Sequence, residues 1–146
     1  LMVTVALRAA GLPLPASMVM MSPAFSLQPL PNTTAYERES RDPMIRQGWA
    51  LDVERALRVP HEHPLADPMQ QDLRGLPPAL VQVGDDEVLF DNAVWYNDAA
   101  TRAGSHSELE IYLKRWHVFQ AHAGLMSSAD QALARQAEFL QRCWRV

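Results

Sequence analysis

Two short stretches of mostly apolar residues constrain the fold of this chain more than any other feature. Residues 16–21 (ASMVMM) and 79–84 (ALVQVG) are each six residues long and run into turn-forming or acidic residues. This length and composition are typical of strands buried on both faces, as in a parallel sheet covered by helices. Residues 108–113 instead alternate acidic with apolar side chains, which predicts a strand near an edge of the sheet.

Segments with helical spacing alternate with these strands. The expected helices cover residues 2–10, 43–57, 89–102 and 127–144, with loops at 24–42 and 61–78. Asp42 is the expected N-cap of the second helix, with Pro43 in its first turn, and Ser127 or Ser128 is the expected cap of the last. Strands that alternate with helices predict right-handed crossovers and a parallel sheet. We therefore expect residues 1–146 to form a single α/β domain or a large part of one.

Composition excludes several classes of function. Thirteen Lys and Arg against 17 Asp and Glu give a net charge of -4, which disfavours binding to nucleic acid. The single cysteine, Cys143, cannot form an internal disulfide or a thiolate metal cluster, so we expect a reducing, cytoplasmic setting. The apolar stretches are much shorter than the roughly 20 residues that span a bilayer, so no membrane span is expected.

Titratable residues follow two of the predicted strands. Asp85, Asp86 and Glu87 come after the second strand, and His117 comes after the third. The carboxyl ends of parallel strands meet at one edge of a sheet, where ligands and catalytic groups gather. An acid and a histidine at this edge are two parts of a nucleophile-histidine-acid relay. The spacing of 30 residues from Glu87 to His117 accommodates one helix and one strand, so both side chains can return to the same edge.

Several segments, taken in order, resemble a known family. They are residues 12–16 (LPLPA), 20–23 (MMSP), 75–84 (GLPPALVQVG), 87–91 (EVLFD) and 116–119 (WHVF). Together they are similar to the C-terminal half of the hormone-sensitive-lipase-like α/β-hydrolases, also called bacterial family IV esterases. The resemblance covers essentially the whole chain. It implies hydrolysis of carboxylic esters with short or medium acyl chains by a Ser-His-acid triad, without a cofactor or a metal.

The resemblance also implies a role for individual residues. His117 matches the triad histidine, which takes the serine proton and later activates water. Many members have Asp-Pro-Leu-x-Asp where this chain has residues 87–91, so Glu87 takes the position of the triad acid. Asp86 is the reserve candidate, because a slip of one residue in the loop would exchange the two. Asp91 is expected to be a helix-start residue near the site.

The chain departs from the family in one large respect. The family's nucleophile lies in a Gly-x-Ser-x-Gly turn and its oxyanion hole uses a His-Gly-Gly-Gly stretch, and neither motif occurs in these 146 residues. We therefore expect Leu1 to fall just downstream of the missing serine, with the N-terminal half of the same domain as a partner. Resemblance also implies a homodimer formed through the edge strand and the terminal helix. The alternatives are an inactive truncated remnant, a non-catalytic interaction protein with the same fold, or hydrolysis of amides or lactones.

Other conspicuous residues have simpler interpretations. His61, Glu62 and His63 lie between two prolines and lack the helical spacing of zinc proteases, which favours a surface loop. His106 and His122 are expected to be surface or packing residues. Trp116 and Phe119 flank His117; they fit the core better than a ligand pocket, although an acyl or alcohol pocket beside His117 remains an alternative. The terminal helix gives Cys143 no identified base, so we do not expect a catalytic thiol.

Overall fold

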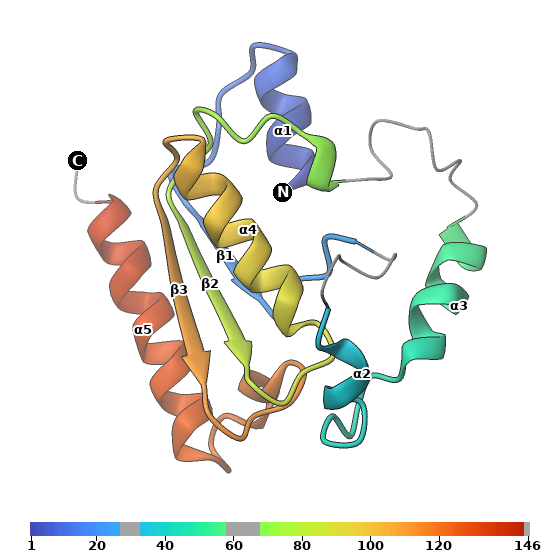
Figure 1. The fold of residues 1–146 in the computed structure, drawn as a ribbon. Helices are drawn as coiled ribbons and strands as arrows, with labels where there is room; N and C mark the ends of the chain where they lie inside the picture. Colours follow the sequence, from blue (N-terminus) through green and yellow to red (C-terminus); the bar gives the residue numbers. More distant parts are fainter. Residues whose placement is uncertain (27–32, 58–67, 145–146) are drawn as a thin grey trace.

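A parallel three-stranded sheet forms the centre of the computed structural model, which describes residues 1–26, 33–57 and 68–144. The sheet order is β1 (Met18–Met21), β2 (Ala79–Gly84) and β3 (Ser107–Tyr112). In the register, Ala79 lies opposite Met18 on one side and Ser107 on the other. All three strands therefore end at the same edge of the sheet (Figure 1). This confirms the predicted parallel α/β architecture.

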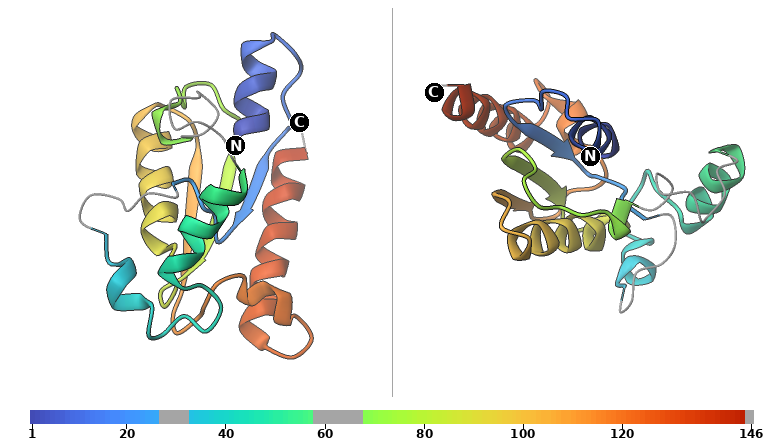
Figure 2. Two further views of the ribbon diagram at one scale, coloured as in Figure 1. Left: turned by 90° about the vertical axis from the view of Figure 1, so that its right-hand side faces the viewer. Right: turned by 90° about the horizontal axis from the view of Figure 1, so that it is seen from above.

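Helices cover both faces of the sheet. α4 (Phe90–Arg102) lies on one face and α5 (Ser127–Trp144) on the other, with the strands between them (Figure 2, right). β2 is buried along its whole length, since it has a strand on each side and a helix on each face. On the α4 side the core contains Val81 and Val83 of β2 with Tyr96 of α4. Burial raises the pKa of Tyr96 to about 12.

The remaining elements lie around this centre. They are α1 (Met2–Ala9), α2 (Ala35–Arg38), α3 (Gln47–Leu57) and two short 3-10 helices, η1 (Pro68–Gln70) and η2 (Phe119–His122). α1 contributes Val5 to the same core cluster as α4. α2 and η1 occupy segments that the sequence predicted as loops, and both are only three or four residues long. Patterns this short carry no detectable periodicity.

Two expectations about burial and helix boundaries are wrong. β1 is not buried on both faces, because Met18 is buried but Met21 is 42% exposed. Among the described residues β1 is an edge strand, so its outer side has no neighbouring strand. α3 begins at Gln47 and not at Pro43, because Asp42 closes a turn ahead of the helix instead of capping its first residue.

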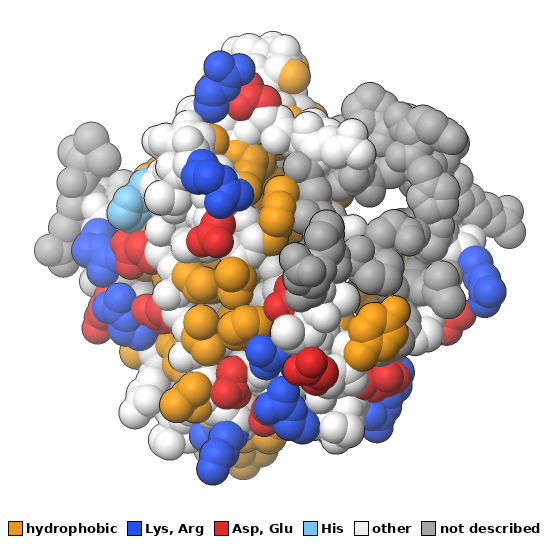
Figure 3. Space-filling model, in the orientation of Figure 1, with side chains coloured by type: hydrophobic (Ala, Val, Ile, Leu, Met, Phe, Trp, Pro, Cys, Tyr) orange, Lys and Arg blue, Asp and Glu red, His pale blue; other side chains and the backbone are white. Residues whose placement is uncertain are grey.

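Charged side chains of both signs are mixed on the face shown in Figure 3. There, Lys and Arg side chains lie beside Asp and Glu, with apolar side chains of α4 between them. A typical ion pair of the molecule joins Arg142 to Glu108 at 2.8 Å. The mixture agrees with the small net charge of -4.

Asp42 is buried and fastens the segment before α3 to the loop between β2 and α4. Its Oδ1 accepts hydrogen bonds from the backbone N–H groups of Met44 and Ile45 at 2.9 and 3.2 Å. The other oxygen, Oδ2, accepts one from the N–H of Val88 at 3.1 Å. The side chain is only 1% exposed, so water cannot replace these partners.

Replacing Asp42 with alanine is expected to lower the free energy of unfolding by about 3 kcal/mol, because three backbone donors lose a charged acceptor. Chemical denaturation of the two proteins measures the difference. Asp98→Ala is the matched control, since Asp98 is exposed on α4 and its loss should change stability by less than about 0.5 kcal/mol. Equal stabilities for the two variants would contradict the structural role of Asp42.

Candidate active site

The loops that follow the three strands converge at the carboxyl edge of the sheet. Ser22 follows β1, residues 85–87 follow β2 and residues 113–118 follow β3. Hydrogen bonds tie these loops together: Asp86 N–H donates to the Arg115 carbonyl oxygen at 3.0 Å, and Val118 N–H donates to Ser22 Oγ at 2.9 Å. This edge is where the sequence predicts that an acid and a histidine meet.

Glu87 and His117 face each other at this edge. Glu87 Oε2 lies 3.6 Å from His117 Nδ1, and the side chains are 0% and 18% exposed. Neither of these two buried atoms has a hydrogen-bond partner elsewhere in the described part of the chain. The distance is slightly longer than a hydrogen bond, so a small shift of either side chain would form one. Such a hydrogen bond would join the Glu87 carboxylate to the His117 imidazole.

The second oxygen of Glu87 is held by other donors. Oε1 accepts a hydrogen bond from the backbone N–H of Gly84 at 2.6 Å and one from the hydroxyl of Ser22 at 2.7 Å. The Glu87 N–H in turn donates to the Gly84 carbonyl oxygen at 3.3 Å, which closes a tight turn after β2. One carboxylate oxygen is thus anchored while the other is directed at His117.

The two aspartates of this loop point elsewhere. Asp86 forms an ion pair with Arg41 at 2.9 Å, and Asp85 Oδ1 accepts the N–H of Lys114 at 2.5 Å. Of the three acids after β2, Glu87 is the one whose carboxylate lies against His117. The structure therefore places Asp86, the reserve candidate, away from the imidazole.

Gly84 allows the loops after β2 and β3 to approach each other. A Cβ atom at this position would lie 2.0 Å from the carbonyl oxygen of Arg115 and 2.4 Å from its carbonyl carbon. No side chain fits at such distances, so only glycine permits the contact. The sequence showed Gly84 as the end of a strand but not this approach, which depends on a residue 31 positions later.

Sequence reasoning missed Ser22, which contacts both of the other loops. Ser22 and its hydrogen-bond donor Val118 both have left-handed backbones, with φ of 48° and 50°. This conformation is uncommon for serine and strongly unfavourable for a β-branched residue, and such strain concentrates at functional sites. The available signal was a Ser-Pro pair at the predicted carboxyl end of a strand.

Residues at the start of α4 anchor the loop that follows β1. Asp91 accepts hydrogen bonds from the Thr33 hydroxyl at 2.8 Å and from the Thr34 N–H at 2.5 Å. Asn92 accepts the N–H groups of Phe25 and Ser26 at 2.9 and 2.8 Å. Asp91 lies in the first turn of α4, which confirms its interpretation as a helix-start residue.

The aromatic residues beside His117 have different environments. Phe119 is completely buried and packs with Ala129 and Ala132, so it belongs to the core and not to a pocket. Trp116 is partly buried against the same cluster and meets His122 edge-on at 5.5 Å. His122 is thus a packing residue, as expected.

The other candidates lie away from Glu87 and His117 or outside the described residues. His106 pairs with Glu108 at 3.1 Å, at the opposite end of β3. Cys143 is partly buried in α5. Residues 61–63, the His-Glu-His stretch, are not among the described residues. In the part of the chain that the structure describes, no cluster of three His, Cys, Asp or Glu is arranged to hold a metal, and no helix is long and apolar enough to cross a membrane.

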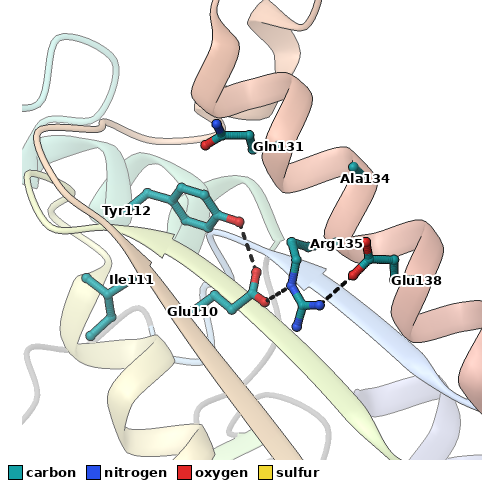
Figure 4. A pocket seen from close by; sticks show the side chains of 7 residues that line it. All are labelled: Glu110, Ile111, Tyr112, Gln131, Ala134, Arg135 and Glu138. Carbon is teal, nitrogen blue, oxygen red and sulfur yellow. Dashed lines mark hydrogen bonds and ion pairs between the residues drawn. The ribbon is translucent and has the colours of Figure 1, made fainter.

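A groove between β3 and α5 is separate from this site. In Figure 4, Glu110 accepts hydrogen bonds from Tyr112 and Arg135, and Arg135 also reaches Glu138. Burial, followed by the hydrogen bond to Glu110, raises the pKa of Tyr112 well above its usual value. The lining includes neither Glu87 nor His117, and its single Arg, Arg135, lies between two carboxylates.

The chain matches a family and several individual proteins. A model of the alpha/beta hydrolase fold matches residues 1–121. An acetyl-hydrolase of Streptomyces hygroscopicus is 34% identical over 93% of this chain and 46% of its own length, and an esterase of Acinetobacter venetianus is 28% identical over 86% and 42%. This chain thus spans about half the length of these relatives.

Solved structures agree with the family assignment. A crystal structure of an esterase from the bacterial hormone-sensitive lipase family has a TM-score of 0.89 and 34% identity, covering 97% of this chain and 48% of that one. A structure of EstE5 soaked in ethyl alcohol has a TM-score of 0.92 and 34% identity, covering 100% of this chain and 50% of that one. The chain therefore belongs to the α/β-hydrolase fold family, and its solved relatives place it beside the bacterial hormone-sensitive lipase-like esterases.

Proposed function

We propose that the protein containing this chain hydrolyses carboxylic esters with short or medium acyl chains through a Ser-His-acid triad. In this proposal His117 is the general base and acid, and Glu87 is the carboxylate that orients it. The observation that carries the proposal is the approach of Glu87 Oε2 to His117 Nδ1 at the carboxyl edge of the sheet, in a chain related to esterases. The serine and the oxyanion donors would come from a part of the protein outside these 146 residues.

The pair would act as follows. A carboxylate at Nδ1 keeps the proton on that nitrogen, so Nε2 is free to take the proton of a serine hydroxyl as its oxygen attacks the ester carbonyl carbon. The imidazolium then gives this proton to the leaving alcohol, and an acyl-serine ester remains. Water attacks that ester with His117 again as base, which releases the acid and restores the serine. Burial of Glu87 strengthens its interaction with the imidazolium.

The missing residues would have to lie next to β1. The outer edge of β1 has no partner strand among the described residues, and Met21 at the end of β1 is 42% exposed. We propose that the segment bearing the nucleophile pairs with this edge, which would bring its serine beside Ser22 and His117. Pairing would also cover an exposed strand edge, which otherwise favours aggregation.

An ester hydrolysis assay tests the proposal on the protein expressed from its complete reading frame. A solved relative was soaked with p-nitrophenyl butyrate and another structure of it carries PMSF, which makes both reagents suitable probes. We expect faster hydrolysis of p-nitrophenyl acetate and butyrate than of the dodecanoate, and loss of activity after treatment with PMSF. A folded protein that hydrolyses none of these esters would overturn the proposal in favour of an inactive protein with the same fold. Hydrolysis only of amides or lactones would overturn the ester specificity.

A further inference from the structure

We propose that Ser22 is a positioning residue for the pair formed by Glu87 and His117. The inference rests on the proposed function and extends it to a residue whose role follows from its hydrogen bonds. Ser22 is 3% exposed and stands directly after β1, 65 residues before Glu87 and 96 before Val118. It is thus the point at which the loops after all three strands are joined.

The direction of each hydrogen bond at Ser22 is determined by its partner. The backbone N–H of Val118 can only donate, so Ser22 Oγ accepts that bond at 2.9 Å. The single hydroxyl proton of Ser22 is therefore available for Glu87 Oε1 at 2.7 Å, and an ionised carboxylate can only accept. This gives a polar chain from Val118 N–H through the Ser22 hydroxyl to Glu87.

The hydroxyl helps to fix the orientation of the Glu87 carboxylate plane, so that one oxygen faces the imidazole. Ser22 and the Gly84 N–H both bond to Oε1, at 2.7 and 2.6 Å, so Oε2 remains for His117. Without Ser22, only the Gly84 N–H would hold Oε1, and the carboxylate could rotate about its last bond. A partial rotation would turn the facing oxygen away from Nδ1 of His117 and remove the partner that orients it.

Ser22 also acts on the other side of the pair. Val118 follows His117 directly and has the left-handed backbone that β-branched residues avoid. The Ser22 oxygen accepts the N–H of this strained residue, so it helps to hold the turn from which the imidazole projects. One hydroxyl therefore restrains the acid through its side chain and the histidine through its backbone.

Two substitutions separate the hydroxyl from the backbone strain of Ser22 itself. Ser22→Ala removes the hydroxyl and keeps a Cβ at φ 48°, whereas Ser22→Gly removes the hydroxyl and relieves that strain. Ser17→Ala is the matched control, because Ser17 Oγ at the start of the same segment is buried without a hydrogen-bond partner. All variants are made in the protein expressed from its complete reading frame.

Both Ser22 variants are expected to lower kcat for p-nitrophenyl butyrate by about 10- to 100-fold, with KM changed less than about twofold, because the misplaced groups act in the chemical step. Ser17→Ala should retain the kcat of the wild type. If Ser22 only supported the local backbone, Ser22→Gly would keep the kcat of the wild type, because glycine relieves the backbone strain at this position. Wild-type kcat in either Ser22 variant would overturn the proposal.

A second readout does not depend on esterase activity. We expect a strongly downfield proton NMR signal from His117 Nδ1–H bonded to a carboxylate, present in the wild type and in Ser17→Ala. It should disappear in Glu87→Gln and weaken or disappear in both Ser22 variants. An unchanged signal in the Ser22 variants, or none in the wild type, would overturn the role of Ser22. Absence of ester hydrolysis alone would overturn only the proposed function, so the two failures are distinguishable.

Discussion

Replacing His117 with alanine is expected to lower kcat/KM for ester hydrolysis by about 10,000-fold or more, because the serine loses the base that activates it and the leaving alcohol loses its proton donor. The assay compares p-nitrophenyl butyrate hydrolysis by the wild type and the variant, both expressed from the complete reading frame. His106→Ala is the control, since His106 lies at the opposite end of β3 and its side chain is 61% exposed beside Glu108. Full activity of His117→Ala would refute the assignment of His117.

Two further variants identify the acid of the triad, according to which of them loses more activity. Glu87→Gln should lower kcat/KM less than His117→Ala does, because the imidazole remains. The loss is still large, because the amide NH₂ of the glutamine, facing Nδ1, would favour the wrong tautomer of His117. Asp86→Asn should lower kcat/KM only about twofold, because it weakens a partly exposed ion pair with Arg41 and leaves Glu87 in place. If Asp86→Asn were the more damaging variant, the role of the acid would pass to Asp86.

The elements of this fold were predictable where local pattern decides the outcome. The residues of β2 and α5 follow from a short apolar run and from helical spacing, and both were predicted with the bounds that the structure has. Asp42 shows where local pattern fails. It has the chemistry of an N-cap and does accept two backbone N–H groups, but its second oxygen is occupied by Val88, 46 residues away. The segment is therefore fixed by a distant contact, and α3 begins later.

The candidate site, too, was predictable only in part. The sequence places Glu87 and His117 at one edge, because strand order alone brings the loops after β2 and β3 together. The family resemblance favoured Glu87 over Asp86, but the strand pattern by itself does not show which side chain faces His117, since the directions of adjacent side chains in a tight turn depend on the Gly84 N–H and on Arg41. Ser22 was missed because both of its partners lie more than 60 residues away, and no sequence spacing records such a contact.

Replacing Gly84 with alanine is expected to destabilise the protein by about 4 kcal/mol or more, which for a domain of this size can prevent folding. The added methyl group would lie 2.0 Å from the Arg115 carbonyl oxygen. Because the obstacle is backbone and not the end of a flexible side chain, relief requires the loop after β3 to move. Chemical denaturation, or the soluble yield where the variant does not fold, measures the effect.

Gly48→Ala is the matched control for this substitution. Gly48 is in the first turn of α3, and a Cβ there would meet nothing within 4 Å, so alanine should leave stability unchanged or raise it by up to about 1 kcal/mol. The comparison of the two variants also tests how the loops of the site are arranged. The Arg115 carbonyl oxygen that would clash with a Cβ at Gly84 also accepts a hydrogen bond from the Asp86 N–H, next to Glu87. A Gly84→Ala protein as stable as the wild type would show that the Arg115 backbone does not cross Gly84. Such a result would contradict the close approach of Arg115 to Gly84, through which the loop that carries His117 meets the loop that carries Glu87.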